Sequence, residues 1–296
     1  MVTKMPTRKV LYASNVYANL RRNEKFKFSS AYLLSIYGLN AVCTYIPKNA
    51  CSSLRFSVAM SNGYVSSISD VGWIHNNNDA FVATKREATT ADYAFVILRC
   101  PYRRAVSAFL DKIVGGEIYR LQSSQRERVE HKKGLISHTV KGANLFGTHR
   151  KESLKRKLEA MSFRSFIEEI ADQPAEKKDH HWRNQSDFLM FNEYDDYFCV
   201  EDINGAIDTL KSRGFDLVDT RPALRHDTSF QRETVEVSAD TTVANLRALK
   251  LLKRLPGPAA LYDGELYDLV SEVFADDIAL YQTKVNTGSL LPRPNH

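Results

Sequence analysis

A lysine and two serines lie in a turn of the sequence that could bind an anion. Residues 42–46 form an apolar, β-branched run typical of a buried strand, Pro47 ends its hydrogen-bond ladder, and helical spacing follows the turn. A helix N-terminus presents unpaired N–H groups and the positive end of the helix dipole. Lys48 adds a charge there, and Ser52 and Ser53 add two hydroxyl groups. The turn therefore predicts an anion-binding loop.

The same plan of strand, turn and helix returns about fifty residues later. Residues 95–98 are apolar and Arg99 follows them, and Pro101 suits the first turn of a helix. The helix has an apolar stripe that comprises Ala105, Val106, Phe109, Leu110 and Ile113. Ser107 lies off this stripe, on the same face as Arg103. The repeated unit is typical of an α/β fold with parallel strands.

Together the two motifs resemble those of sulfotransferases that use 3′-phosphoadenosine 5′-phosphosulfate (PAPS). The segment PKNACSSLR resembles the P-K-x-x-x-[ST]-[ST] loop for the 5′-phosphosulfate, in the form found in carbohydrate sulfotransferases of sulfotransferase family 2. By this resemblance the loop binds the donor through Pro47, Lys48, Asn49, Ala50, Cys51, Ser52 and Ser53. The second motif resembles R-D-P-[YF]-x-R-x-x-S, whose arginine and serine hold the 3′-phosphate. This implies that role for Arg99 and Ser107, while Cys100 replaces the usual aspartate.

Three later segments resemble the same family. Residues 179–185, DHHWRNQ, are similar to its H-W-R-x-Q element, residues 194–203 to the strand that follows, and residues 266–281 to its closing helix. The resemblance thus spans residues 41–281. It predicts a single α/β sulfotransferase domain over residues 1–296, with a central, mostly parallel sheet flanked by helices.

The resemblance implies in-line transfer of a sulfuryl group from PAPS to a hydroxyl of a carbohydrate or glycoconjugate. The departing phosphate gains negative charge, which Lys48 in the loop would stabilise. The acceptor hydroxyl also needs a base, and histidine suits neutral pH. His75 lies in a long crossover where some heparan-type relatives place a catalytic histidine, and His181 precedes Trp182 and Arg183. The sequence leaves both candidates open.

Composition indicates a globular protein, because 43% of the 296 residues are hydrophobic and 26% are charged. The sequence contains no run of about 18 apolar residues, so no transmembrane segment is predicted. Cys43, Cys51, Cys100 and Cys199 lie on predicted strands or beside the two motifs, so we expect reduced thiols and a cytoplasmic protein. Neither a C-x-x-C pair nor an H-E-x-x-H helix is present, so no metal is expected.

Positive charge is concentrated in a basic insertion over residues 115–160. Between Arg120 and Lys157, eleven basic residues stand against three acidic ones, a net +8, whereas the whole chain carries +6. The insertion follows the helix that carries Ser107, so we expect it to be an acceptor-binding lid. Its charge favours an acceptor that is anionic or associated with a membrane.

The rest of the chain is predicted from periodicity and turn residues. Residues 1–40 are basic and aromatic without clean periodicity, and are expected to form an N-terminal arm. Residues 61–93 form a polar, asparagine-rich crossover. Further helices are predicted after Ser162, over residues 203–212, over about 242–255 and over 264–281.

Two other classes of function each fit a single feature. A phosphate-loop kinase would need G-x-x-x-x-G-K-[ST], but here the lysine comes first and no glycine lies between Gly38 and Gly63. A nucleic-acid-binding protein could use the basic insertion. The insertion contains no known docking motif and no regular interleaved aromatics, so no nucleic acid partner is expected.

Overall fold

A computed structural model describes residues 8–12, 19–20, 22–115, 152–153, 155–224, 235–285 and 287–294. The chain forms two compact units. The first comprises Met1–Arg104, Ala175–Asp227 and Phe274–Leu291, and the second comprises Ala105–Pro174, Thr228–Val273 and Pro292–His296. Most of the basic insertion lies outside the described residues, so its role as an acceptor-binding lid stays a prediction.

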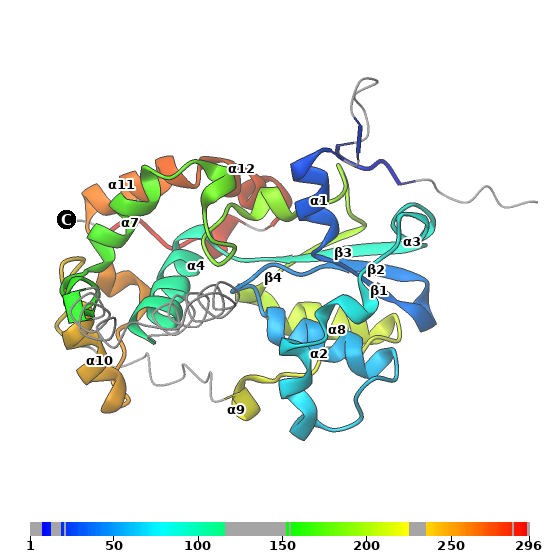
Figure 1. Ribbon diagram of the computed structural model, residues 1–296, viewed down its shortest axis with the longest axis horizontal. Helices are drawn as coiled ribbons and strands as arrows, with labels where there is room; N and C mark the ends of the chain where they lie inside the picture. Colours follow the sequence, from blue (N-terminus) through cyan, green and yellow to red (C-terminus); the bar gives the residue numbers. More distant parts are fainter. Residues whose placement is uncertain are drawn as a thin grey trace, which may run out of the picture. The chain divides into compact units, whose positions relative to one another are not determined.

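The first unit is built on a four-stranded sheet with the strand order β1-β2-β3-β4 (Figure 1). Its strands are β1 (Leu33–Ile36), β2 (Ala41–Thr44), β3 (Tyr93–Leu98) and β4 (Asp196–Cys199). The pairs β2–β3 and β3–β4 are parallel, and β1 joins β2 antiparallel at the edge. The prediction of a mostly parallel α/β sheet flanked by helices is confirmed.

Helices cover both faces of this sheet. In Figure 1, α2 (Cys51–Ser61) and α8 (Ile203–Ser212) lie on one side, and α1 (Glu24–Ser30) and α12 (Ala275–Lys284) lie on the other. Two shorter helices, α3 (Lys85–Thr90) and α9 (Arg221–Leu224), belong to the same unit. A parallel sheet covered on both faces needs strands without an exposed side, and β2 is buried along its whole length.

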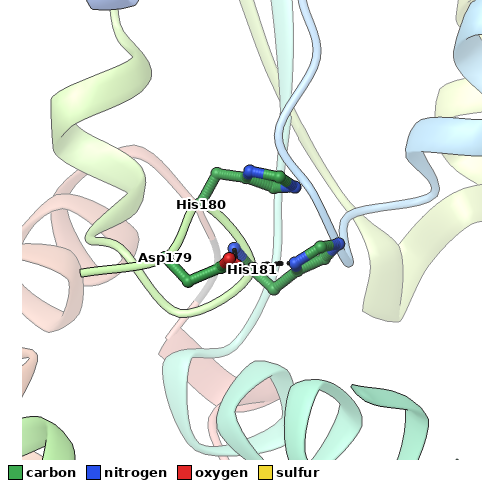
Figure 2. A group of neighbouring side chains, drawn as sticks. All are labelled: Asp179, His180 and His181. Atoms are coloured by element: carbon green, nitrogen blue, oxygen red, sulfur yellow. Dashed lines mark hydrogen bonds and ion pairs between the residues drawn. The ribbon is translucent and has the colours of Figure 1, made fainter. Parts of the chain in front are cut away.

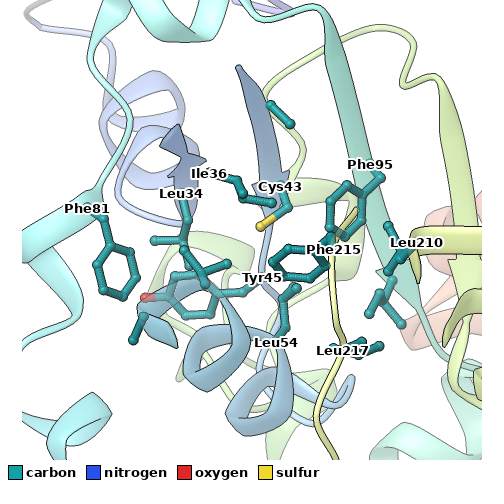
Figure 3. Packing of buried hydrophobic residues seen from close by; sticks show 14 residues of the cluster. Leu34, Ile36, Cys43, Tyr45, Leu54, Phe81, Phe95, Leu210, Phe215 and Leu217 are labelled. Atoms are coloured by element: carbon teal, nitrogen blue, oxygen red, sulfur yellow. The ribbon is translucent and has the colours of Figure 1, made fainter. Parts of the chain in front are cut away.

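A hydrophobic core lies between the sheet and the pair α2 and α8 (Figure 3). Cys43 and Phe95 project from adjacent strands, and Leu54 and Leu210 project from the two helices, all of them with an exposed fraction of 0%. The chain after α8 closes this core with Phe215 and Leu217. Because the core fixes both β2 and α2, it also fixes the loop between them.

Short helices fill the connections. They are η1 (Tyr37–Leu39), η2 (Ile68–His75), η3 (Asn78–Phe81), η5 (Ala175–Lys177), η6 (Gln185–Phe188), η7 (Val200–Asp202), η9 (Pro258–Leu261) and η10 (Thr287–Ser289). The polar crossover after α2 is therefore η2, η3 and α3 rather than an irregular loop. Among the residues that the structure describes, no helix combines the length and the apolar character that a membrane span requires.

The second unit is helical. Helix α4 (Pro101–Ala108) begins in the first unit and continues as the π-helical segment η4 (Phe109–Val114). The unit also holds α7 (Phe163–Ala171), α10 (Val243–Leu251) and α11 (Gly264–Val273). Ser162 caps α7 by accepting a hydrogen bond from the N–H of Ser165, so the predicted N-cap is confirmed.

Two stretches differ from the sequence-based interpretation. Residues 1–40, interpreted as an arm, contribute α1 and the edge strand β1. Four-residue strands such as β1, buried throughout, show no alternation that would distinguish them from a short apolar helix segment. The predicted helix 264–281 is two helices, α11 and α12, because Phe274 leaves helical geometry between them.

A buried glutamine joins the ends of β2 and β3 in the first unit. Gln185, with an exposed fraction of 0%, accepts hydrogen bonds from Asn49 Nδ2 (2.6 Å) and from the N–H of Arg99 (3.0 Å). Its own Nε2 donates to the carbonyl of Arg99 (2.9 Å). Asn49 Nδ2 also donates to the carbonyl of Ile97 (3.0 Å). One amide pair thus fixes the loop after β2 against the end of β3.

A buried carboxylate holds that glutamine in place. Asp277 of α12 accepts hydrogen bonds from the N–H groups of Gln185 (2.8 Å) and Ser186 (3.0 Å). Burial raises the pKa of Asp277, while the nearby Arg104 guanidinium and these N–H groups act to lower it. Helix α12 therefore orients the start of η6, and through it Gln185.

We predict that Gln185→Ala destabilises the protein by at least about 2 kcal/mol, because it removes the side-chain partner of the Arg99 N–H, that of the Arg99 carbonyl and one of the two acceptors of Asn49 Nδ2, at about 1–3 kcal/mol for each unsatisfied group. Urea unfolding measures the change. Ser186→Ala is the matched control, because only the backbone N–H of Ser186 bonds Asp277, and its stability should stay within about 0.5 kcal/mol of wild type. Equal stabilities of the two variants would contradict a structural role for the Gln185 amide.

Candidate anion-binding site

The loop between β2 and α2 turns sharply without glycine. Lys48 has a φ of 73° and Ala50 a φ of 52°, both in the left-handed region. For residues with a Cβ this conformation costs about 1–2 kcal/mol each. The buried side chain of Asn49 lies between them and holds the strained turn to β3 and Gln185. Backbone strain of this kind is concentrated in functional loops.

The loop presents the N-terminus of α2. The first hydrogen bond within the helix runs from the N–H of Leu54 to the carbonyl of Ala50 (3.0 Å), so helix geometry gives the N–H groups of the preceding residues no partner inside the helix. Ser52 is half-buried. Ser53 is buried and its hydroxyl contacts Thr220 Oγ1 (3.1 Å) and accepts from the Thr220 N–H (3.1 Å). One of the two predicted serines therefore also anchors the chain before α9.

Arg99 brings a guanidinium to this loop. Its Nη1 donates to the carbonyl of Lys48 (2.9 Å). Burial lowers the pKa of Arg99, and Glu201 opposes that effect. Within the described part of the chain, Nε of Arg99 is buried without a hydrogen-bond partner, and so is Nε of Arg103 on α4. Two buried guanidinium donors without partners point to an anionic ligand that would satisfy them.

Ser107, the other residue of the second motif, lies further along α4 and is half-buried. It belongs to the second unit, whereas Arg99 belongs to the first. The predicted role of Ser107 in holding the 3′-phosphate therefore rests on the spacing of the sequence motif.

The first turn of α4 is capped by Glu201. Both carboxylate oxygens accept from the N–H of Cys100 (3.2 Å each), and Oε2 also accepts from the Tyr281 hydroxyl (3.0 Å). Cys100 Sγ accepts from the N–H of Leu291 (3.3 Å). The chain thus accommodates cysteine in place of aspartate, and Glu201 serves as a cap rather than a free acid.

Sequence analysis did not assign a role to Arg104. This residue is 2% exposed and donates to three carbonyls, those of Pro47 (3.2 Å), Arg183 (2.8 Å) and His180 (3.5 Å). Burial lowers its pKa to about 10, and Asp277 opposes this, so the group stays charged at neutral pH. Arg104 therefore holds the 180–183 segment beside the anion-binding loop. Its place inside the second motif was the available signal.

Asp179, directly before that segment, forms a cluster with His180 and His181 (Figure 2). Asp179 Oδ1 lies 2.6 Å from Nδ1 of His181 and accepts from the His181 N–H (2.9 Å). Burial acts to raise the pKa of Asp179, but these hydrogen bonds outweigh it and lower the pKa to about 2. Asp179 is thus a carboxylate at neutral pH, and it orients the imidazole of His181 so that Nε2 faces away from it.

The same cluster could bind a metal ion. One ligand atom from each of Asp179, His180 and His181 lies within 4.8 Å of the others. His180 is exposed and its ring centroid is 4.0 Å from that of His181. Imidazole nitrogens and a carboxylate suit zinc or a similar transition metal. No other group of this kind occurs among the described residues.

The second candidate base lies elsewhere. His75 is the exposed last residue of η2. This helix packs its Val71 and Ile74 on Phe56, in the middle of α2 rather than at its N-terminus. His181 lies between His180 and Arg183, whose carbonyls Arg104 holds together with that of Pro47, next to Lys48.

A comparison with known proteins identifies the family of the chain. Residues 39–282 match the model of a family described as the sulfotransferase family, and this range contains Lys48, Arg99 and His181. Neither the curated proteins nor the solved structures contain a match to the chain. Because the family model covers most of the sequence, including both motifs and the segment of the histidines, the chain belongs to the sulfotransferase family.

Proposed function

We propose that this sulfotransferase uses PAPS as donor and a carbohydrate or glycoconjugate hydroxyl as acceptor. The main support for this proposal is that the two motifs lie together. Arg99 Nη1 donates to the Lys48 carbonyl, and the buried Nε of Arg99 has no hydrogen-bond partner within the described chain. PAPS carries a 5′-phosphosulfate and a 3′-phosphate, and the site offers a helix N-terminus for the first and arginine side chains for the second.

In the proposed reaction the acceptor oxygen attacks sulfur, and the bond from sulfur to the 5′-phosphate oxygen breaks. Negative charge develops on that oxygen, and Lys48 stabilises it from the loop. The proton of the acceptor hydroxyl passes to Nε2 of His181, and Asp179 stabilises the imidazolium that forms. Adenosine 3′,5′-bisphosphate and a sulfate ester leave.

Several wider features belong to the same proposal. The two compact units act as one sulfotransferase domain, which is supported by a family match that includes segments of both. The proposal also assigns contact with the acceptor to the basic insertion, since its sequence follows α4 and carries a net +8 between Arg120 and Lys157. A cytoplasmic location is supported by four free cysteines.

Donor recognition can be tested with nucleotides alone. Adenosine 3′,5′-bisphosphate should bind about 10- to 150-fold more tightly than AMP, because a hydrogen bond to a charged group contributes about 1.5–3 kcal/mol. Ser107→Ala should reduce this preference, and Ser212→Ala, at the exposed end of α8, should not. Isothermal titration calorimetry measures both affinities. Equal binding of the two nucleotides by the wild type would contradict the assignment of the second motif.

The base can be identified by comparing the two histidines. His181→Gln should lower kcat by at least about 100-fold, the usual contribution of general base catalysis, with little change in nucleotide affinity. His75→Gln is the control and should remain near wild type. Transfer of radiolabelled sulfate from PAPS measures turnover. The opposite ranking of the two variants would move the base to His75.

The proposed reaction needs no metal, because the loop and the arginines supply the positive charge. An ion bound by Asp179, His180 and His181 would occupy the proposed base, so zinc should inhibit transfer and EDTA should leave it unchanged. His180→Ala should raise the zinc concentration needed for inhibition several-fold, since it removes one ligand and leaves the pair of Asp179 and His181. Loss of turnover in EDTA, restored by zinc, would show instead that the ion takes part.

A further inference from the structure

Two leucines in the second unit are unusually exposed. Leu251 at the end of α10 and its neighbour Leu252 have exposed fractions of 87% and 67%, and the other exposed large hydrophobic residues of the described chain are below 50%. A single exposed leucine is ordinary, but two adjacent ones at one turn form an apolar tip.

This tip is ordered and surrounded by positive charge. Beyond Leu252 the chain turns through Lys253, whose φ is 56°, and the N–H groups of Lys253 and Arg254 bond back to the carbonyls of Lys250 (3.0 Å) and Leu249 (2.9 Å). Lys253 and Arg254 are exposed, and Lys250 is half-buried. From residue 247 to residue 254 the sequence has four basic residues and no acidic one.

Both ends of the basic insertion also meet α10. Arg247 donates from Nε to the carbonyl of Val114 (3.0 Å) and from Nη2 to that of Ile113 (3.1 Å), just before the insertion begins. Its Nη1 lies 4.0 Å from Oε1 of Glu159, which is two residues beyond Lys157 and near the end of the insertion. Arg247, four residues before Leu251 on α10, therefore contacts described residues on both sides of the undescribed part of the insertion.

We infer that the Leu251–Leu252 tip docks on an anionic lipid bilayer. The leucines enter the boundary between headgroups and acyl chains, and Lys253 and Arg254 contact lipid phosphates. Apolar insertion combined with charge selects this partner, because a nucleic acid or an acidic glycan in solution would satisfy the basic residues and leave both leucines in water. The inference is independent of the chemistry proposed above. It would place the enzyme where an acceptor at a membrane surface can reach it.

Vesicle flotation with the full chain tests the inference. The wild type should float with phosphatidylcholine–phosphatidylglycerol vesicles and not with phosphatidylcholine alone. Replacing both leucines by Leu251→Ser and Leu252→Ser should weaken binding by at least about tenfold, and Lys253→Gln with Arg254→Gln by about fivefold for each charge. Ile68→Ser, at an exposed apolar residue of the first unit, is the matched control and should bind like the wild type.

A second measurement follows insertion directly. With Leu252→Trp, tryptophan emission should shift to the blue on anionic vesicles, whereas Ile68→Trp should show no shift. All variants alter exposed side chains, so thermal unfolding should confirm that they fold as the wild type does.

Three results would overturn the inference. The first is failure of the wild type to float with anionic vesicles. The second is binding that depends on Lys253 and Arg254 but not on the leucines, which is charge adsorption without insertion. The third is a fall in molecular mass by light scattering when the leucines are replaced, without loss of flotation. That last result would make the tip a contact between copies of the chain.

Discussion

The site depends on the pairing of one buried side-chain amide with the backbone at the end of β3. Gln185 both donates to and accepts from Arg99, and it accepts from Asn49 in the neighbouring loop. Polar groups buried this deeply are costly unless they are paired, so the arrangement tolerates little displacement. Asp277 of α12 accepts a hydrogen bond from the N–H of Gln185. A helix near the C-terminus of the sequence therefore helps to position a loop near its start.

This constraint explains how a loop without glycine keeps a strained shape. Lys48 and Ala50 occupy left-handed conformations, and the loop is held from outside by Asn49, Arg99 and Arg104. Two of the side chains that restrain the backbone, Arg99 and Arg104, also carry positive charge. In the proposed function these groups both support the loop and attract an anion, and a ligand phosphate would add partners to guanidinium nitrogens that the described chain leaves unsatisfied.

Basic residues have different surroundings in the first unit and at the end of α10. In the first unit, Glu201 and Asp277 lie near Arg99 and Arg104, so the buried arginines keep their protonated state. The exposed basic residues at the end of α10 stand without acidic neighbours in sequence, and they border two leucines in water. In the proposals made above, the buried charges orient a small ligand, whereas the exposed charges act on an extended anionic surface.

The sequence by itself determined the elements whose signals are local. The strand before Pro47, the strand before Arg99, the helix capped by Ser162 and the two anion-binding motifs each follow from residues adjacent in the chain. Tertiary structure alone decided the edge strand β1, the division of the last predicted helix at Phe274, and the hydrogen bonds of Arg104 that support the proposal of His181 rather than His75 as base. These depend on contacts between residues far apart in sequence, such as Arg104 with His180 and Gln185 with Asp277, and neither periodicity nor motif spacing records such contacts.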